Sequence, residues 1–187
     1  LVCDTGSSHR CKRLNVLETQ RLTLRRLDFS DAPFILELVN DADWLRHIGD
    51  KNVHDLDGAR RYLAEGPLAM YAQRGHGLWL AALRDGTPLG LCGLLKRDSL
   101  EHVDLGYALL PQYRGHGYAR EAAAACLAYG FEVLRLPRIV AITSQDNDAS
   151  GRVLESIGLR FERLTPAPDG RELKLYAAAA PAAAPRA

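Results

Sequence analysis

The chain has 187 residues, which is enough for one compact domain with a substantial core and too few for two domains of ordinary size. Hydrophobic residues make up 47% and charged residues 25%, a composition that excludes a mainly disordered chain. The formal net charge of +1 gives no global attraction to nucleic acid or acidic membranes, and no apolar run is long enough to span a bilayer.

Cysteine use and the first residues favour a reducing compartment. The four cysteines form no CxxC or His/Cys spacing typical of a metal site. Cys92 and Cys126 lie in apolar patterns, so we expect them to be small buried hydrophobic residues. The start, Leu1-Val2-Cys3-Asp4, lacks the layout of a signal peptide. We therefore expect a cytoplasmic protein with no metal site and no nucleic-acid or membrane partner.

In chain order, the sequence first predicts a loose arm over residues 1–16, because no period is visible there. Polar and apolar residues alternate over 21–25, as in a half-buried strand. Ser30 is then predicted to cap a helix. Residues 55–73 favour one or two further helices, interrupted near Gly66-Pro67.

Three strands are predicted next, over 77–84, 87–96 and 101–110. Asp85-Gly86 between the first two is a strong hairpin signal, which makes those two strands neighbours. A helix over 118–131 then presents small residues on its apolar face, which permits close packing against a sheet.

The last part of the chain predicts a strand over 138–143, a helix over 147–157 ended by Gly158, and a closing hairpin. An Ala- and Pro-rich tail over 178–187 is expected to be frayed, since its prolines forbid a continuous helix. The whole order predicts a single domain over 17–177 with a mixed α/β (α+β) architecture and helices on both faces of a central sheet. It does not fit the regular strand–helix alternation of a doubly wound nucleotide fold.

Residues 104–119 carry the clearest chemistry. A strand leads into a Gly-rich turn that opens a helix, and the first turn of a helix has unpaired N–H groups and the positive end of its dipole. Gly115 and Gly117 let the backbone approach a phosphate, while Arg114 and Arg120 add positive charge at the rim. The stretch therefore predicts a pyrophosphate site, with a Gly-rich turn that binds no ligand as the alternative. It matches neither the P-loop motif nor the dinucleotide fingerprint.

The same stretch resembles the signature of the GNAT superfamily of N-acetyltransferases, in which Arg or Gln is followed after two residues by Gly and after one more by Gly or Ala. Arg114-Gly115-His116-Gly117-Tyr118-Ala119 meets this signature, with Pro111 at its usual place upstream. Asn147-Asp148-Ala149-Ser150 resembles the family's downstream Asn-x-x-Ser helix. Asp104-Leu105-Gly106-Tyr107 resembles the branch that contains the ribosomal-protein N-terminal (alanine) acetyltransferases. The resemblance covers about residues 17–177.

The resemblance implies a mostly antiparallel sheet, acetyl-CoA as co-substrate, and an amine acceptor that is either a protein N-terminus or a small molecule. Backbone groups of a splayed strand at 107–109 would pair with pantetheine, amides of 115–120 would hold the pyrophosphate, and Asn147 would bond the pantetheine arm. The cofactor-binding residues that it implies are Tyr107, Ala108, Leu109, Arg114, Gly115, His116, Gly117, Tyr118, Ala119, Arg120, Asn147 and Ser150.

Direct attack in a ternary complex needs a neutral amine, so some group must accept a proton. Where many relatives carry a carboxylate base and a tyrosine acid, this chain has Ile142 and Leu154, which move no proton. Asp104 is the favoured base, and His102, on the same strand face by the period of two, is the second candidate. A structural hydrogen bond is the alternative role for Asp104.

The acceptor and the assembly stay open at this stage, and a monomer and a homodimer both fit the sequence. Two other functions remain: a catalytically weak acyl-CoA-binding sensor of the same fold, and a phosphate-binding scaffold unrelated to CoA. Among the remaining side chains, we expect four histidines at the surface, two tryptophans in the core or a pocket wall, and an aromatic cluster as a candidate lining of the acceptor groove: His47, His54, His76 and His116; Trp44 and Trp79; Tyr62, Met70 and Tyr71.

Overall fold

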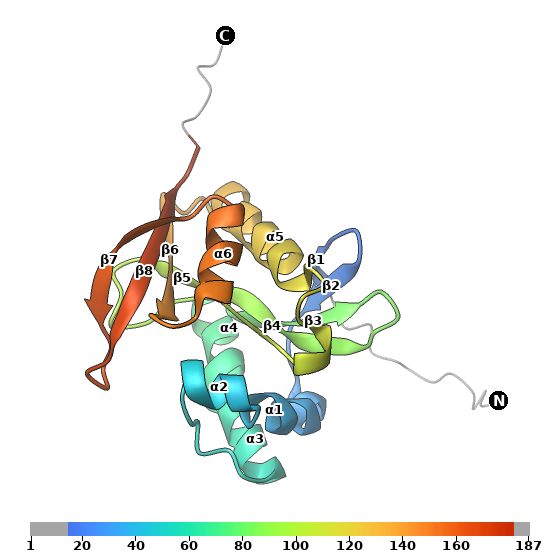
Figure 1. The fold of residues 1–187 in the computed structure, drawn as a ribbon. Coiled ribbons are helices and arrows are strands. Elements are labelled where there is room, and N and C mark those ends of the chain that lie inside the picture. The colour runs from blue at the N-terminus through green and yellow to red at the C-terminus, as the bar shows by residue number, and fades with distance from the viewer. Residues whose placement is uncertain (1–14, 182–187) are drawn as a thin grey trace, which may run out of the picture.

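The computed structural model describes residues 15–181. They form one eight-stranded sheet with the order β1-β2-β3-β4-β5-β6-β8-β7 (Figure 1). None of the helices in this described part is long and apolar enough to cross a membrane. The strands are β1 (Asn15–Glu18), β2 (Leu22–Arg25), β3 (Leu78–Leu83), β4 (Pro88–Leu95), β5 (Val103–Leu109), β6 (Arg138–Ser144), β7 (Arg160–Pro166) and β8 (Glu172–Ala179). The α-helices are α1 (Ala32–Val39), α2 (Ala42–His47), α3 (Leu56–Leu63), α4 (Ala69–Arg74), α5 (Tyr118–Glu132) and α6 (Asp148–Ser156).

Neighbouring strands are antiparallel throughout this sheet except for β5 and β6, which run parallel. Figure 1 shows α5 and α6 on one side of the sheet and α1 to α4 on the other. The predicted mixed, mostly antiparallel sheet with helices on both faces is thereby confirmed.

Two hydrophobic cores fill the space between the sheet and its helices. On one face, Ala122, Ala123 and Cys126 of α5 pack in one cluster with the fully buried Trp79, so the small residues of this helix allow the close packing that the sequence predicts. On the opposite face, side chains of α1 and α3 pack against Leu80 and its neighbours. Each large apolar side chain that is fully buried contributes about 1.5–3 kcal/mol to folding.

The two parallel strands separate soon after they meet. Their ladder holds two residue pairs, of which the second joins Asp104 to Val140. Beyond that point β5 stays paired with β4 as far as Leu109, and β6 stays paired with β8 as far as Ser144. The facing edges of β5 and β6 therefore lack a partner strand and form a wedge in the sheet.

Both ends of the sheet extend beyond the predicted strands. β1 pairs with β2, so residues 15 and 16 belong to the sheet and not to a loose arm. β8 pairs with β6 as far as Ala179, inside the segment expected as a frayed tail. The rest of the expected arm (1–14) and the last residues of the tail (182–187) lie outside the described residues.

The helical half near the N-terminus also differs from expectation. The cap is Asp28 and not Ser30: the Asp28 carboxylate accepts the N–H of Ser30 at 2.8 Å and starts a 3-10 turn that leads into α1. α2 was not predicted, and its start is capped by Asp41. The interruption expected between α3 and α4 is a π-helical turn, Ala64–Leu68, which keeps the chain helical.

Candidate active site

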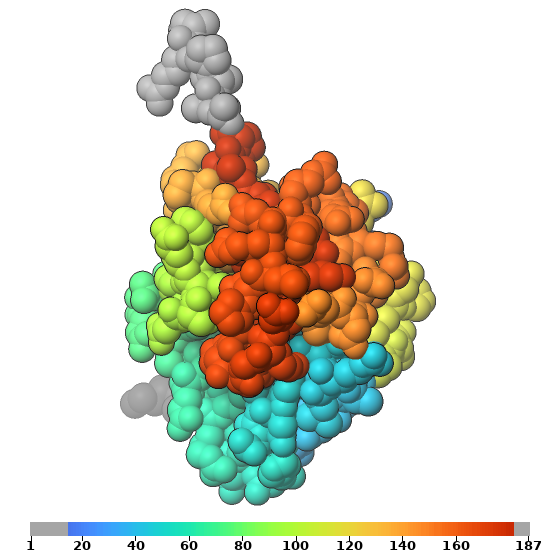
Figure 2. All heavy atoms as spheres, turned by 60° about the vertical axis from the view of Figure 1, so that its left-hand side comes forward, coloured from blue at the N-terminus to red at the C-terminus, as the bar shows by residue number. Residues whose placement is uncertain are grey.

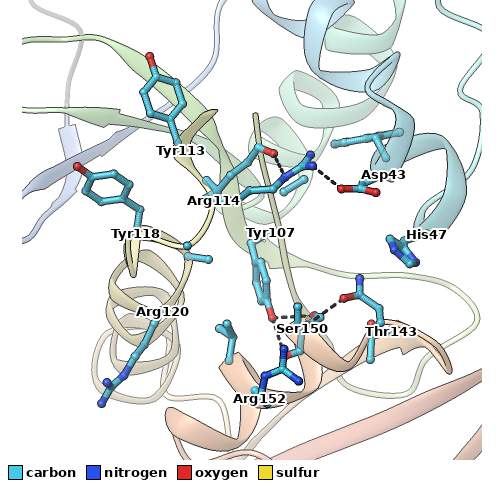
Figure 3. A pocket seen from close by; sticks show the side chains of 18 of the residues that line it. Asp43, His47, Tyr107, Tyr113, Arg114, Tyr118, Arg120, Thr143, Ser150 and Arg152 are labelled. Carbon is cyan, nitrogen blue, oxygen red and sulfur yellow. Dashed lines mark hydrogen bonds and ion pairs between the residues drawn. The ribbon is translucent and has the colours of Figure 1, made fainter. Parts of the chain in front are cut away.

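A cavity of about 570 Å³, here called the wedge cavity, opens where β5 and β6 diverge (Figure 3). Residues of α2, α5 and α6 complete its walls. Every residue predicted to bind the cofactor lines it except His116, which is exposed and donates from Nδ1 to the Arg114 carbonyl at 2.8 Å. The wedge thus brings together the two motifs that the sequence analysis singled out.

The first turn of α5 presents uncapped backbone amides to the wedge cavity. Gly117 precedes the helix with a φ of +79°, a left-handed conformation that other residues adopt at a cost. No side chain caps this helix start, so the N–H groups of Tyr118, Ala119 and Arg120 are available to a ligand. Unpaired amides and the positive end of the helix dipole together fit a pyrophosphate.

An ion pair behind this turn holds it in place. Arg21 Nε donates to Glu121 Oε2 at 2.6 Å, and Arg21 Nη1 donates to the His116 carbonyl at 3.0 Å. The Arg21 guanidinium also lies over the Tyr118 ring, 4.6 Å from its centroid. Burial raises the pKa of Glu121, but hydrogen bonds from Thr19 and Arg21 outweigh this and hold that pKa below its usual range. The negative charge of Glu121 in the first turn of α5 is therefore neutralised by Arg21. The start of the helix can then bind an anion without repulsion from Glu121.

Three arginines line the wedge cavity, and they have different surroundings (Figure 3). Arg114 forms ion pairs with Asp41 and Asp43, so its charge is neutralised and it ties the Gly-rich turn to α2. Arg120 and Arg152 form no ion pair with any described residue and remain available to phosphate groups. Arg152 could not be predicted from the sequence, because a single arginine on a helix carries no local signal that it faces a cavity.

Two hydroxyl groups bridge the wedge. Tyr107 Oη on β5 lies 2.8 Å from Ser150 Oγ on α6 (Figure 3). Burial raises the pKa of Tyr107 well above its usual range, although the hydrogen bond with Ser150 opposes part of that rise, so the phenol stays protonated. From the sequence, only a backbone role was expected for Tyr107. Strand alternation predicts which face of the sheet its ring lies on, but it does not predict that the hydroxyl contacts Ser150.

Asn147 has two separate functions available to its amide. Its Oδ1 accepts the N–H of Ser150 at 3.0 Å and so caps α6. Its Nδ2 makes no hydrogen bond with any described residue, and the side chain lines the wedge cavity. The amide can therefore donate to a carbonyl group of a bound ligand while it keeps the helix start in place.

A second cavity of about 290 Å³, here called the side cavity, adjoins the first, since Tyr107 and Ser150 line both. Asp104 lies in its wall with 1% of its surface exposed. Arg97 Nε donates to Asp104 Oδ2 at 2.5 Å, whereas Oδ1 has no hydrogen-bond partner among residues 15–181. Burial raises the pKa of Asp104, while the charge and hydrogen bond of Arg97, and the nearby backbone N–H of Ile142, oppose part of that rise. A buried carboxylate oxygen without a partner is a suitable proton acceptor.

His102, the second candidate base, lies elsewhere. β5 begins only at Val103, so the strand alternation expected to align His102 with Asp104 does not include it. His102 lines a small separate cavity with Glu101 and Arg138, and its Nε2 lies 3.9 Å from Glu101 Oε2. The structure therefore brings only Asp104, of the two candidates, to the wall of the side cavity.

Two histidines expected at the surface are not there. His47 lines the wedge cavity, because the unexpected helix α2 covers one side of it, and its Nδ1 lies 2.7 Å from Ser144 Oγ. His76 is buried and donates from Nδ1 to the Leu94 carbonyl at 2.8 Å. The other two of these histidines are exposed, as expected.

Of the three residues expected to line an acceptor groove, one lines either of the two cavities. Tyr62 lines the side cavity, whereas Met70 lines neither cavity. Tyr71 is buried, with its hydroxyl bonded to backbone groups on both sides. Trp44 forms part of the wall of both cavities and Trp79 lies in the core, as expected.

The two cysteines in apolar patterns are core residues. Cys92 and Cys126 are both fully buried, with their sulfur atoms 3.5 Å apart. Within the described part of the chain, no group of three or more His, Cys, Asp or Glu side chains could hold a metal ion.

Comparison with known proteins identifies the family. Residues 21–160 match the family model described as an acetyltransferase (GNAT) domain. The chain belongs to the GNAT family. This GNAT chain is 31% identical over 153 residues to the uncharacterised protein YkkB of Bacillus subtilis, a match that covers 79% of this chain and 86% of YkkB.

Solved structures agree with that family. An acetyltransferase from Agrobacterium tumefaciens, at 29% identity, superposes with a TM-score of 0.76 over 92% of this GNAT chain and 99% of its own. RimL, the ribosomal L7/L12 alpha-N-protein acetyltransferase solved in complex with coenzyme A, shares the fold at 19% identity, with a TM-score of 0.73 over 89% and 98% of the two chains. The resemblance seen in the sequence is thereby confirmed, and the GNAT chain is an acyltransferase.

Proposed function

We propose that this GNAT protein transfers the acetyl group of acetyl-CoA to an amine by direct attack in a ternary complex. The observation that carries the proposal is the wedge between β5 and β6, where the uncapped start of α5 and the open edge of β5 face one cavity. The side cavity meets it at Tyr107 and Ser150. Two adjoining cavities allow CoA and an amine to be bound at the same time.

The groups around the wedge cavity match coenzyme A along its length. Backbone amides at the start of α5, with Arg120 and Arg152 beside them, suit the phosphates. The edge of β5 between Asp104 and Leu109, which has no partner strand on the β6 side, suits the amide groups of pantetheine. The unbonded Nδ2 of Asn147 adds a donor near that edge.

Bound acetyl-CoA supplies an activated thioester, and the chain's residues supply position and proton transfer. Backbone N–H groups over 107–109 polarise the thioester carbonyl, a contribution of about 3–4 kcal/mol where such donors are fixed in advance. Asp104 accepts a proton from the amine, directly or through a water, as the new N–C bond forms. The hydroxyl pair of Tyr107 and Ser150 gives a proton to the sulfur as the C–S bond breaks and regains one from Asp104 through water, so the proton lost by the amine is balanced by the proton on the new thiol.

The proposal is tested by incubating the protein with acetyl-CoA and a panel of amines while free thiol and acetylated product are both measured. We expect turnover with at least one class of amine. CoA binding without thiol release for any amine would instead favour the acyl-CoA sensor, which the apolar Ile142 and Leu154 keep as the alternative. A thermal-shift titration checks the cofactor, because a CoA site responds to CoA and not to ATP or NAD.

A further inference from the structure

The side cavity contains polar groups that nothing in the described protein satisfies. Lys51 Nζ and Tyr62 Oη line it without a hydrogen bond or ion pair to any residue from 15 to 181. Arg97 uses Nε to hold Asp104, and its two Nη atoms make no hydrogen bond with the described part of the chain. The remaining polar group is Asp104 Oδ1, which is buried and unpaired. The cavity therefore offers several hydrogen-bond donors and one acceptor.

The donors carry a positive charge that is only partly balanced. Partial burial lowers the pKa of Lys51, and the charges of Arg97 and Arg171 lower it further, while Asp169 raises it. Arg171 and Asp169 form an ion pair with each other at the tip of the β7–β8 hairpin. Figure 2 shows this orange-red hairpin lying close to the cyan and teal helices. Because Arg97 is already paired with Asp104, the charge of Lys51 remains in excess beside the side cavity, and an excess positive charge favours the binding of an anion.

Tyr62 adds a neutral donor to the same place. Burial raises the pKa of Tyr62 to about 12, although the positive charge of Arg97 lowers that pKa in part, so the phenol keeps its proton. Its hydroxyl makes no hydrogen bond with any described residue. A phenol, an ammonium and a guanidinium that face one cavity form a set of donors suited to the two oxygens of a carboxylate.

The rest of the side cavity is apolar and small. At about 290 Å³ it suits a small molecule and not a long chain. Its apolar lining comes from both sheet and helices: Trp44, Ile48, Leu78, Leu91, Leu95, Leu105, Ala141, Ile142 and Leu154. A ligand that fills it needs an apolar body beside its charged groups.

We infer that the acceptor is a small amine with an apolar side chain and a carboxylate of its own, an apolar α-amino acid in the simplest case, whose carboxylate binds Lys51, Arg97 and Tyr62. Its amino group then faces Asp104 Oδ1 in the side cavity, which adjoins the wedge cavity at Tyr107 and Ser150. This inference rests on the proposed function and names its substrate class. A polyamine would bring its second positive charge against Lys51 and Arg97, at a cost in affinity.

The first experiment compares kcat/KM for phenylalanine, phenylalaninamide and spermidine with the unchanged protein. Phenylalaninamide has the shape of phenylalanine but lacks the negative charge of its carboxylate. It also represents a peptide N-terminus. We expect phenylalanine to be preferred over both by roughly 10-fold or more, the size of one charge-assisted hydrogen bond. An equal or reversed preference would overturn the inference, and would favour a protein N-terminus if the amide is the better substrate or a polyamine if spermidine is.

Binding provides a readout that does not depend on turnover. Calorimetry of the CoA complex measures affinity for N-acetylphenylalanine and N-acetylphenylalaninamide, in the protein and in Lys51→Met and Tyr62→Phe. We expect Lys51→Met to lower the affinity for N-acetylphenylalanine about 10-fold and to leave the affinity for N-acetylphenylalaninamide unchanged. Lys174→Met is the matched control, because Lys174 lines neither cavity and pairs with Asp148 at 3.3 Å.

The outcomes separate this inference from the proposed function. Lys51→Met could change the affinity for both ligands equally, or for neither, while CoA still binds and other amines are acetylated. In that case only the proposed carboxylate site is wrong. If CoA does not bind and no amine releases thiol, the proposed function is wrong, and this inference is wrong as well. A carboxylate-specific loss in Lys51→Met and Tyr62→Phe, absent from Lys174→Met, supports both.

Discussion

The hydroxyls of Tyr107 and Ser150 lie 2.8 Å apart and join strand β5 to helix α6 across the open wedge of the sheet. These two residues line both cavities, so a proton on this pair is close to any group transferred between the cavities. The raised pKa of Tyr107 keeps that proton in place at any ordinary pH. The pair is thus placed to act as the acid for the departing thiolate.

Removing either hydroxyl should slow the reaction without loss of CoA affinity. We expect Tyr107→Phe and Ser150→Ala each to lower kcat by about 10- to 100-fold, at the low end for proton transfer because a thiolate is a fair leaving group. If the two act as one relay, the double variant is no slower than either single variant, and a steady-state comparison of all three shows this. Tyr129→Phe, whose ring packs on Trp79, is the control and should keep full activity. Additive losses would mean that the hydroxyls work separately.

A negative charge at position 117 should lower the affinity for CoA and raise the stability of α5. An aspartate there places a negative charge next to the phosphate site, yet the same charge suits the positive end of the α5 dipole. Gly117→Asn adds a side chain of the same size in the same left-handed conformation, and so isolates the charge. We expect Gly117→Asp to bind CoA at least about 10-fold more weakly than Gly117→Asn by calorimetry, with a melting temperature at least as high. Equal affinities would place the pyrophosphate elsewhere.

The two functions of Asn147 can be separated with two substitutions. Asn147→Ala loses both the cap of α6 and the free donor, and should cost about 1 kcal/mol of stability together with a higher KM for acetyl-CoA. Asn147→Ser keeps a capping oxygen but has no amide donor, so it should melt near the unchanged protein while KM still rises. Thermal unfolding and steady-state kinetics on the same samples provide both numbers. If KM returns to normal in Asn147→Ser, the residue is a cap alone.

Asp104→Asn should lower the acetylation rate by roughly 10²–10⁴-fold and leave CoA affinity nearly intact. A base works in its ionised form, so activity is lost as pH falls through its pKa. Since burial raises the pKa of Asp104, that acidic limb should lie above the value of about 3.9 for an ordinary aspartate, and should be missing in the variant.

Turnover against pH with two acceptors of different basicity is the check on this assignment. A limb that belongs to Asp104 stays at the same pH for both acceptors. A limb that moves with the acceptor would mean that amines arrive already neutral and that the buried carboxylate only holds Arg97.

The parts of this protein that depend on neighbours along the chain could be predicted from the order of its residues. Alternating strands, the turn at Asp85-Gly86 and the small-residue face of α5 reflect local conformational preference and short-range spacing, and the structure has each of them. The Gly-rich turn belongs to the same class, because a left-handed glycine before a helix creates its unpaired amides locally. α2 was missed, since a helix of six residues leaves too short a pattern to recognise.

Which charges and hydroxyls meet depends on how distant segments of the chain pack together. Arg114 pairs with Asp41, 73 residues away along the chain, and so turns from an expected phosphate ligand into a tie to α2. Lys51 and Arg97 share one cavity because separate segments fold against the same strand. Partners of this kind are chosen by distance in space and by burial, which sets the strength of each charge, and neither quantity is encoded in the spacing of residues along the chain.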